Sequence, residues 1–211
     1  MDSRAFDMPA GADALDVGGV AVHQGFLGRG AQARLVAEVS AVRAAAPPFR
    51  PVTPGGREMR VRMTSAGTLG WYADRRGYRY LPAHPSGAPW PAIPDTALSV
   101  WHAVTGLAQA PDSCLINLYD AEARMGLHQD RDEADLSWPV VSISLGDSAR
   151  FRVGGTSRGG STRSVWLHSG DVAVMAGAAR LLHHGIDRVR GGSSNLLEEG
   201  GRINLTMRVA G

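Results

Sequence analysis

Apolar residues in the first half of the chain follow two helical patterns. The first spans residues 31–46 and ends at Pro47-Pro48; its apolar positions are Leu35, Val36, Val39 and Val42. The second spans residues 94–110 and opens with Pro94-Asp95. Apolar residues recurring every three or four positions predict an amphipathic helix, and proline ends or begins one. We therefore predict two helices that pack on the outside of a larger core.

After Pro111 the pattern changes to short strand-like segments separated by turns rich in Gly and Ser. Strands are predicted at residues 114–119, 140–145, 150–153, 164–167, 171–175 and 203–209, with earlier ones at 20–23 and 57–64. Residues 67–90 are predicted to be mainly loop and turn. Many short strands with frequent turns are typical of a sandwich or barrel. The fold class is therefore predicted to be mainly β with flanking helices (α+β).

Length and composition indicate an ordinary globular domain. The chain has 211 residues, of which 44% are hydrophobic and 20% charged, enough for one domain with a substantial core. No apolar run approaches the ~20 residues that span a bilayer, so we expect no membrane partner. Residues 1–10 lack the apolar segment of a secretory signal, and Cys114 is the single cysteine. We therefore expect a cytoplasmic protein.

Charge becomes informative only through its distribution. The net charge is +2, and all 22 basic residues are arginine. Residues 50–80 contain seven arginines against two acids, Glu58 and Asp74. Such a local excess is suited to phosphate binding, but it is equally typical of a solvated surface. Charge alone leaves both interpretations open.

Residues 127–130, Leu-His-Gln-Asp, carry the first candidate chemistry. In an extended segment His128 and Asp130 project to the same side, so both can reach one ion. Two histidines and one carboxylate on one face of an octahedron are typical of non-haem Fe(II) oxygenases. The third ligand must then come from elsewhere, and the tract around His183 and His184 offers it. Spacing alone does not choose between these two neighbours.

The last predicted strand adds a second constraint. Alternation places Arg202, Asn204, Thr206 and Arg208 on one face, opposite Ile203, Leu205, Met207 and Val209. An outward polar row on an edge strand would explain this pattern. If the row faces a barrel interior instead, its two guanidinium groups need an anion, because unpaired buried charge is very unfavourable. A dicarboxylate such as 2-oxoglutarate supplies that partner through paired hydrogen bonds.

At this point the chain resembles a known family, the bacterial AlkB-type nucleic-acid dealkylases. The resemblance covers about residues 49–211. Its motifs are Val52-Thr-Pro-Gly-Gly56, Gly70-Trp71 through Tyr80, Cys114-Leu-Ile-Asn117-Leu-Tyr119, residues 127–135, residues 180–186 and residues 202–208. It implies one domain over residues 1–211 with a double-stranded β-helix (jelly-roll) core. Residues 111–211 would form that catalytic core, and residues 50–90 a helical and hairpin lid that recognises the nucleotide.

The resemblance also assigns roles to residues. It chooses His184 over His183, so that His128, Asp130 and His184 would bind Fe(II). Residues that match the 2-oxoglutarate contacts are Asn117, Tyr119, Arg202, Asn204 and Arg208, with Arg208 at the distal carboxylate. Residues that match substrate contacts are Trp71, Tyr78, Arg79, Tyr80, Asp132 and Arg158. Trp71 would stack on the flipped base, and Asp132 would accept a hydrogen bond from its exocyclic amino group.

The function implied is oxidative demethylation of N1-methyladenine and N3-methylcytosine, with O2 as second cosubstrate and formaldehyde, succinate and CO2 as products. The expected partner is alkylated DNA, single- or double-stranded, with RNA as a further candidate, and the expected state is a monomer. Two alternatives remain open. One is a dioxygenase of the same fold that hydroxylates a protein or a small molecule. The other is a non-catalytic nucleic-acid-binding module.

Overall fold

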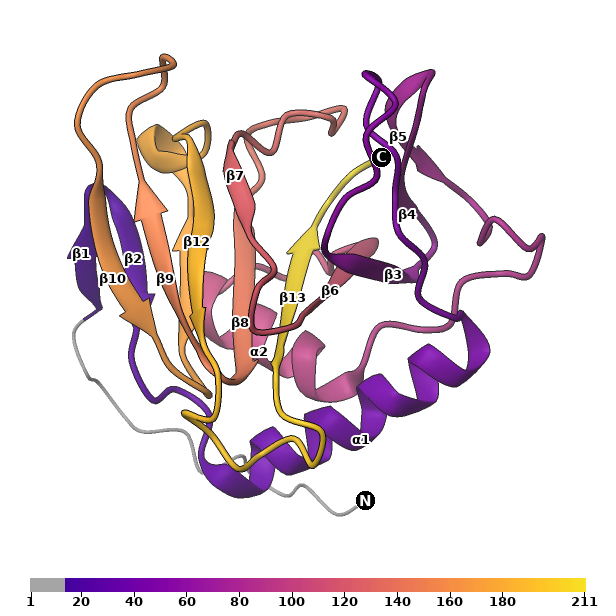
Figure 1. Ribbon diagram of the computed structural model, residues 1–211, viewed down its shortest axis with the longest axis horizontal. Helices are drawn as coiled ribbons and strands as arrows, with labels where there is room; N and C mark the ends of the chain where they lie inside the picture. Colours follow the sequence, from indigo (N-terminus) through magenta and orange to yellow (C-terminus); the bar gives the residue numbers. More distant parts are fainter. Residues whose placement is uncertain (1–13) are drawn as a thin grey trace.

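The strand-like segments pair into two antiparallel sheets that face each other as a jelly-roll (Figure 1) in the computed structural model, which describes residues 14–211. The larger sheet has the order β1 (Leu15–Val17), β2 (Val20–His23), β11 (Val172–Met175), β8 (Val140–Gly146), β13 (Arg202–Arg208), β6 (Ser113–Tyr119), β3 (Arg62–Gly67). The smaller has the order β10 (Arg163–Leu167), β9 (Ser148–Val153), β12 (His184–Arg190), β7 (Met125–His128). A one-turn 3-10 helix, η1 (Gly177–Ala179), precedes β12.

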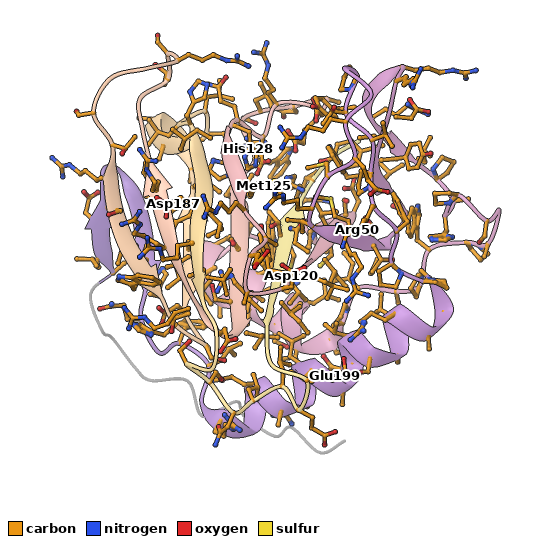
Figure 2. The ribbon with its side chains drawn as sticks, in the orientation of Figure 1. Arg50, Asp120, Met125, His128, Asp187 and Glu199 are labelled. Atoms are coloured by element: carbon orange, nitrogen blue, oxygen red, sulfur yellow. The ribbon has the colours of Figure 1, made fainter. Side chains whose placement is uncertain are left out.

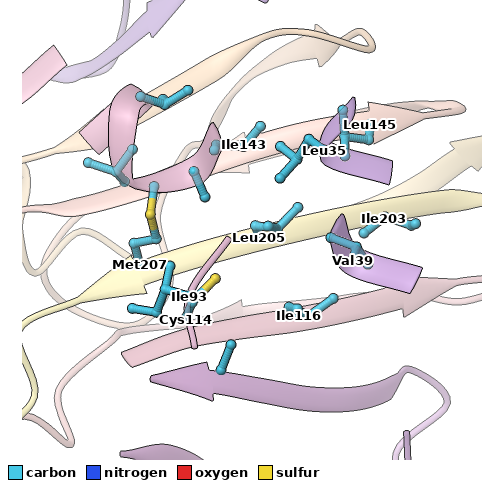
Figure 3. Packing of buried hydrophobic residues seen from close by; sticks show 14 of the residues in the cluster. Leu35, Val39, Ile93, Cys114, Ile116, Ile143, Leu145, Ile203, Leu205 and Met207 are labelled. Carbon is cyan, nitrogen blue, oxygen red and sulfur yellow. The ribbon is translucent and has the colours of Figure 1, made fainter. Parts of the chain in front are cut away.

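Strand β13 lies between β6 and β8, and all seven of its residues are buried. The predicted alternation is confirmed. Ile203, Leu205 and Met207 belong to the hydrophobic cluster behind the larger sheet (Figure 3). The polar residues of the alternate positions face the space between the two sheets, where they line a cavity. The polar row is therefore interior, not the solvent face of an edge strand.

Both predicted helices pack behind the larger sheet. Helix α1 (Arg29–Ala45) buries Leu35 and Val39, and α2 (Asp95–Thr105) buries Val100 and Trp101, in the same cluster as the apolar residues of β13. Figure 1 shows α1 running along the base of the molecule. Helix α2 ends five residues earlier than predicted because Gly106 adopts a left-handed conformation, φ 67°, and caps it.

Residues 50–90 hold a β-hairpin, and α1 and α2 flank this range in the sequence. The apolar stripes of α1 and α2 hold both helices against the larger sheet. Residues 67–90, predicted to be mainly loop, contain β4 (Gly70–Asp74) paired with β5 (Gly77–Leu81). Figure 1 shows this hairpin rising at the same end of the molecule as the loop between β9 and β10.

Other differences concern strand ends. The strand predicted at residues 57–64 begins only at Arg62, although Val61 and Met63 are buried as the alternation indicated. Strands β1, β7 and β12 were not predicted as strands. No helix of residues 14–211 is long and apolar enough to cross a bilayer. The N-terminal segment, on which the absence of a secretory signal was predicted, lies outside the described residues.

Candidate metal and cosubstrate site

The candidate metal ligands meet where β7 ends and β12 begins. His128 and His184 are register partners across these strands, and Asp130 follows β7 by two residues. Each offers one ligand atom, and the three atoms lie within 4.8 Å of one another. The Nε2 atoms of His128 and His184 are 3.8 and 3.7 Å from the two carboxylate oxygens of Asp130. Figure 2 shows His128 between the sheets, near the end where the hairpin rises.

Backbone carbonyls orient both imidazoles. The Nδ1 atom of His128 lies 2.9 Å from the oxygen of Gly126, and that of His184 lies 3.0 Å from the oxygen of Leu182. A carbonyl only accepts hydrogen bonds, so each Nδ1 carries the proton and each Nε2 keeps its lone pair for an ion. His183 also hydrogen-bonds a carbonyl, that of Gly155, but it is not part of the three-residue group.

Strand β12 can approach β7 this closely because residue 185 is glycine. A Cβ on Gly185 would lie 2.5 Å from the oxygen of Met125 and 2.7 Å from that of Gly126, well inside van der Waals contact. The backbone of β7 therefore excludes any side chain at this position. The glycine that follows His184 is what lets the two histidine-bearing strands lie side by side.

Protonation states also favour a cation. Burial lowers the pKa of His184 to about 4, so its imidazole is neutral at neutral pH, as a metal ligand must be. Burial alone would raise the pKa of Asp130, but Arg208, His184 and His128 outweigh it and hold that pKa below its usual range. The site thus offers a neutral imidazole at His184 and a carboxylate at Asp130.

Several buried polar atoms around the candidate metal ligands have the properties of atoms that bind a metal ion or a small ligand. Within residues 14–211, the buried atoms without a hydrogen-bond partner include Asp130 Oδ2, Asn117 Oδ1, Arg202 Nε and Arg208 Nη1. Buried polar groups are almost always partnered, so unsatisfied acceptors beside imidazoles and unsatisfied guanidinium donors indicate a cation and an anion. Fe(II) and a dicarboxylate fit these residues.

The two arginines of β13 lie in different surroundings. Arg208 donates from Nη2 to Oδ1 of Asp130 at 2.8 Å, so it lies at the metal end. Arg202 is 1% exposed; its Nη2 donates to Ser144 Oγ at 2.8 Å. Burial lowers the pKa of Arg202 to about 10, which leaves it charged at neutral pH, and no carboxylate of residues 14–211 forms an ion pair with it. Arg208, which was expected to bind the distal carboxylate of 2-oxoglutarate, thus contacts a candidate metal ligand, whereas Arg202 does not.

The other residues expected to contact 2-oxoglutarate lie on β13 and on its neighbour β6. Asn204 Nδ2 donates to Ser142 Oγ at 2.7 Å, and its Oδ1 accepts from Asn117 Nδ2 at 3.1 Å. Tyr119 is paired with Arg202 across β6 and β13, and burial raises its pKa to about 12. All five residues line one cavity with the three candidate metal ligands, and its volume is about 580 Å³.

Two further charged residues stabilise this site and were missed. Glu133, whose side chain is 1% exposed, accepts from Arg180 Nη2 at 3.0 Å and lies 3.1 Å from Arg208 Nε. Arg180 also donates to the backbone oxygen of Asp130 at 2.6 Å. Both residues lie within the conspicuous motifs, 127–135 and 180–186, but nothing in their spacing shows that they meet.

Of the expected substrate contacts, Trp71, Tyr78, Asp132 and Arg158 line the same cavity. The Trp71 indole donates from Nε1 to Asp132 Oδ2 at 3.0 Å. Its ring stacks on Tyr78 with 5.5 Å between centroids and 20° between planes. The hairpin and the loop after β7 thus meet over the cavity through one tryptophan and one carboxylate.

Arg79 and Tyr80 have other partners. The Arg79 guanidinium bonds both oxygens of Asp74 at 2.8 and 2.7 Å, which lowers the pKa of that carboxyl to about 2. Tyr80 donates its hydroxyl to Glu133 at 2.8 Å. Neither is among the residues that line the cavity. The structure therefore ties Tyr80 to the buried ion cluster and does not bring Arg79 to the candidate metal ligands.

A jelly-roll with two histidines and an aspartate beside two buried arginines defines a class of metal-dependent oxygenases. A family model described as the 2OG-Fe(II) oxygenase superfamily matches residues 19–208. The chain is 52% identical over 195 residues to the alpha-ketoglutarate-dependent dioxygenase AlkB homolog of Caulobacter vibrioides (strain NA1000 / CB15N), covering 92% of this chain and 89% of that one. It is 41% identical to the alpha-ketoglutarate-dependent dioxygenase AlkB of Escherichia coli (strain K12), covering 84% of each.

A solved structure, that of OsALKBH1, is similar with a TM-score of 0.76 and 29% identity, covering 92% of this chain and 97% of that chain. The chain belongs to the 2OG-Fe(II) oxygenase superfamily and, within it, to the AlkB-type alpha-ketoglutarate-dependent dioxygenases. It is an enzyme that uses Fe(II) and 2-oxoglutarate, and His128, Asp130 and His184 form its candidate metal site.

Proposed function

We propose that this dioxygenase repairs nucleic acids by oxidative demethylation of N1-methyladenine and N3-methylcytosine. The observation that carries the proposal is the Trp71–Asp132 pair in the cavity of the metal triad. An indole offers a stacking surface for a base, and a carboxylate accepts from an exocyclic amino group. The relatives named AlkB and ALKBH1, among them a nucleic acid dioxygenase of Homo sapiens, support the same substrate class.

Fe(II), 2-oxoglutarate and O2 together supply the oxidation of an N-methyl group, after which formaldehyde leaves and the base is restored. The residues of the chain hold these groups in place. His128, Asp130 and His184 bind the iron. Arg202 binds the carboxylate of 2-oxoglutarate that lies away from the metal, since its charge lacks a carboxylate partner.

The remaining cosubstrate contacts follow from this orientation. Arg208 lies beside the metal-binding end, because it already contacts Asp130. Asn117, Tyr119 and Asn204 line the space between the two arginines and offer amide and hydroxyl groups to the keto acid. Fork-like pairing of guanidinium with carboxylate fixes the orientation of the bound cosubstrate as well as its affinity.

The base must leave its stack to reach the metal, because its methyl group lies on the Watson–Crick edge. Trp71 is half-buried on the hairpin and offsets part of the unstacking energy; stacking on an aromatic contributes about 1–3 kcal/mol per base. The base would lie between Trp71 and the imidazole of His128. Asp132 would accept from the exocyclic amino group and also balance the positive charge of a methylated base.

Phosphates flanking the base are the proposed partners of Tyr78, Arg79 and Arg158, while Tyr80 forms the wall of the pocket through Glu133. In this view residues 1–211 form one catalytic domain, with 50–90 as its recognition lid and 111–211 as its core. We propose DNA as the main substrate, RNA as a second one, and a monomer acting in the cytoplasm.

The proposal is tested by mass spectrometry of oligonucleotides that carry N1-methyladenine or N3-methylcytosine, after incubation with Fe(II), 2-oxoglutarate and air. We expect each methylated oligonucleotide to lose one methylene mass while one formaldehyde appears. An unmethylated oligonucleotide and the His128→Ala variant serve as controls. Turnover of 2-oxoglutarate to succinate with the methylated bases left intact would contradict the proposal and favour a protein or small-molecule substrate.

A further inference from the structure

The outer side of the smaller sheet carries a concentration of arginine. Its outward positions include Arg150 and Arg152 on β9, Arg188 and Arg190 on β12, and Trp166 on β10. These five residues are called the outer arginine face. Their neighbours in the register, Phe151, Val153 and Ile186, point inward to the hydrophobic core between the sheets. The face is therefore the solvent side of a wall whose inner side encloses the active site.

A β-bulge increases the polarity of this face. The register of β12 against β9 shifts between Ile186, which pairs with Phe151, and Arg188, which pairs with Arg150. One extra residue, Asp187, is inserted, so two consecutive side chains project outward where regular alternation would allow one. Asp187 uses this position to bind Arg150, with two hydrogen bonds of 2.7 Å each.

The face keeps a positive charge after this pairing. Asp187 lies 3.7 Å from Arg152 as well, and is the one carboxylate among the outward positions of β9, β10 and β12. Four guanidinium groups against one carboxylate give these positions a net charge of +3. Arg188 and Arg190 are exposed, and Arg190 rests on Trp166 with its Cζ 4.3 Å from the ring centroid. The ring holds that charge in place.

The face is continuous with the mouth of the active site. Arg152 donates from Nε and Nη2 to the hydroxyl of Thr162, at the end of the loop between β9 and β10. The same loop carries Arg158, which lines the cavity. From His184, at the metal, to Arg190 the strand runs six residues, or about 20 Å. Figure 2 shows Asp187 on the smaller sheet, to the left of and below His128 in this view.

We propose that the outer arginine face binds the single-stranded flank of the nucleic-acid substrate, by contacts to its phosphates. The inference rests on the proposed function and extends it. Outward side chains on one strand recur about every 6.6 Å, a spacing that suits successive phosphates of an extended strand. A flexible single strand can bend over the loop and follow the wall, whereas a stiff duplex across the mouth cannot. The face therefore favours single-stranded over duplex substrates.

The test compares two methylated substrates of different length in the variant Arg188→Gln/Arg190→Gln. One is a trinucleotide, which fills the active site only. The other is a single strand of about 20 nucleotides, longer than the site sizes of about 4–16 nucleotides known for single-strand-binding modules. We expect the affinity for the long strand to fall roughly tenfold and the salt dependence of log K to become shallower by about 1.4, the value for two lost phosphate contacts. Kinetics with the trinucleotide should not change.

A matched control removes the same charge elsewhere. Arg34→Gln/Arg43→Gln lies on α1, at the base of the molecule, and should leave the long strand bound as tightly as in the wild type. Arg188→Lys/Arg190→Lys keeps the charge and should restore most of the affinity. An equal loss in the α1 variant, or an equal loss with the trinucleotide, would overturn the inference.

Measurements of binding and of turnover show whether this inference or the proposed function fails. If the wild type binds the long strand through the face but leaves the methylated base intact, the proposed function fails and the face stands. If the wild type repairs both substrates and the Gln variant binds the long strand with unchanged affinity and salt dependence, the face fails and the function stands.

Discussion

Strand β13 and the β4–β5 hairpin border the same cavity but are supported in different ways. Strand β13 lies between two partners, and all its residues are buried. The hairpin is a two-stranded sheet of its own, and the side chains of β5 are half-buried or exposed. Rigid support suits groups whose geometry must not vary, such as metal and cosubstrate ligands. The less supported hairpin suits contacts that adapt to different bases.

Tyr80 links the two regions. It lies on the hairpin but donates to Glu133, which contacts Arg208 of β13, which in turn contacts the metal ligand Asp130. The comparison therefore predicts a gradient of effects. Substitution of the buried metal ligand Asp130 should lower activity and stability together, and substitution of Trp71 on the hairpin should alter substrate use alone.

The largest effect is expected for Asp130→Ala. Turnover should fall below detection, because a ligand of the metal is lost. The free energy of unfolding should also fall by about 3–5 kcal/mol, since Arg208 loses a buried partner at 2.8 Å. Formaldehyde assays and chemical denaturation measure the two effects. His128→Ala, at a half-exposed position, is the control: it should lose turnover but keep most of the stability. Full turnover in either variant would refute the metal assignment.

Arg202→Met should weaken the binding of 2-oxoglutarate. A hydrogen bond between charged groups contributes about 1.5–3 kcal/mol, so losing one should raise the KM for 2-oxoglutarate by roughly 10- to 150-fold. Stability should change little, because the substitution removes a buried charge that lacks a carboxylate partner. Titration with 2-oxoglutarate at saturating substrate measures the change. An unaltered KM would remove Arg202 from the cosubstrate site.

Trp71→Ala should weaken the use of nucleic-acid substrates without affecting the buried metal and cosubstrate site. Loss of stacking worth about 1–3 kcal/mol predicts a decrease of roughly 5- to 150-fold in kcat/KM for methylated oligonucleotides. Turnover of 2-oxoglutarate in the absence of nucleic acid should persist, since no metal or cosubstrate contact is removed. Measuring succinate and formaldehyde in parallel checks both statements. A similar loss of succinate formation in the absence of nucleic acid would mean that Trp71 supports the metal site.

Tyr80→Phe should have the smallest effect. It deletes one hydrogen bond of 2.8 Å to Glu133 and preserves the ring. The free energy of unfolding should fall by about 1–3 kcal/mol, and hydrogen exchange of β5 should become faster than that of β13. Iron affinity should not change. Equal acceleration of exchange in β13 would show that the hairpin and the core are one cooperative unit.

The parts that could be predicted from the sequence are those with a local signal. Alternation along residues 202–208 predicted the polar and apolar faces of β13, and periodicity predicted both helices. Family resemblance chose His184, which the geometry of the triad supports. What could not be predicted depends on contacts between distant segments. Glu133 and Arg180 meet only through the fold, and the position of each β13 arginine follows from its neighbours in space.

The hairpin shows the same limit. Residues 67–90 are rich in Gly, Arg and aromatic residues, so their composition indicates a loop, yet β4 and β5 pair throughout. Pairing of two short strands is decided by cross-strand contacts and by the turn, where Gly77 has a φ of 119°. Neither effect is visible in a hydrophobic pattern.

Gly185 has a consequence for any attempt to diversify this enzyme. The position offers no space between β12 and β7, although it directly follows a candidate metal ligand and lines the cavity. A library that randomises the cavity lining for new substrates should therefore recover only glycine here. Selectable variation will gather instead on the hairpin and on the loop between β9 and β10, where side chains border the cavity without separating the two strands.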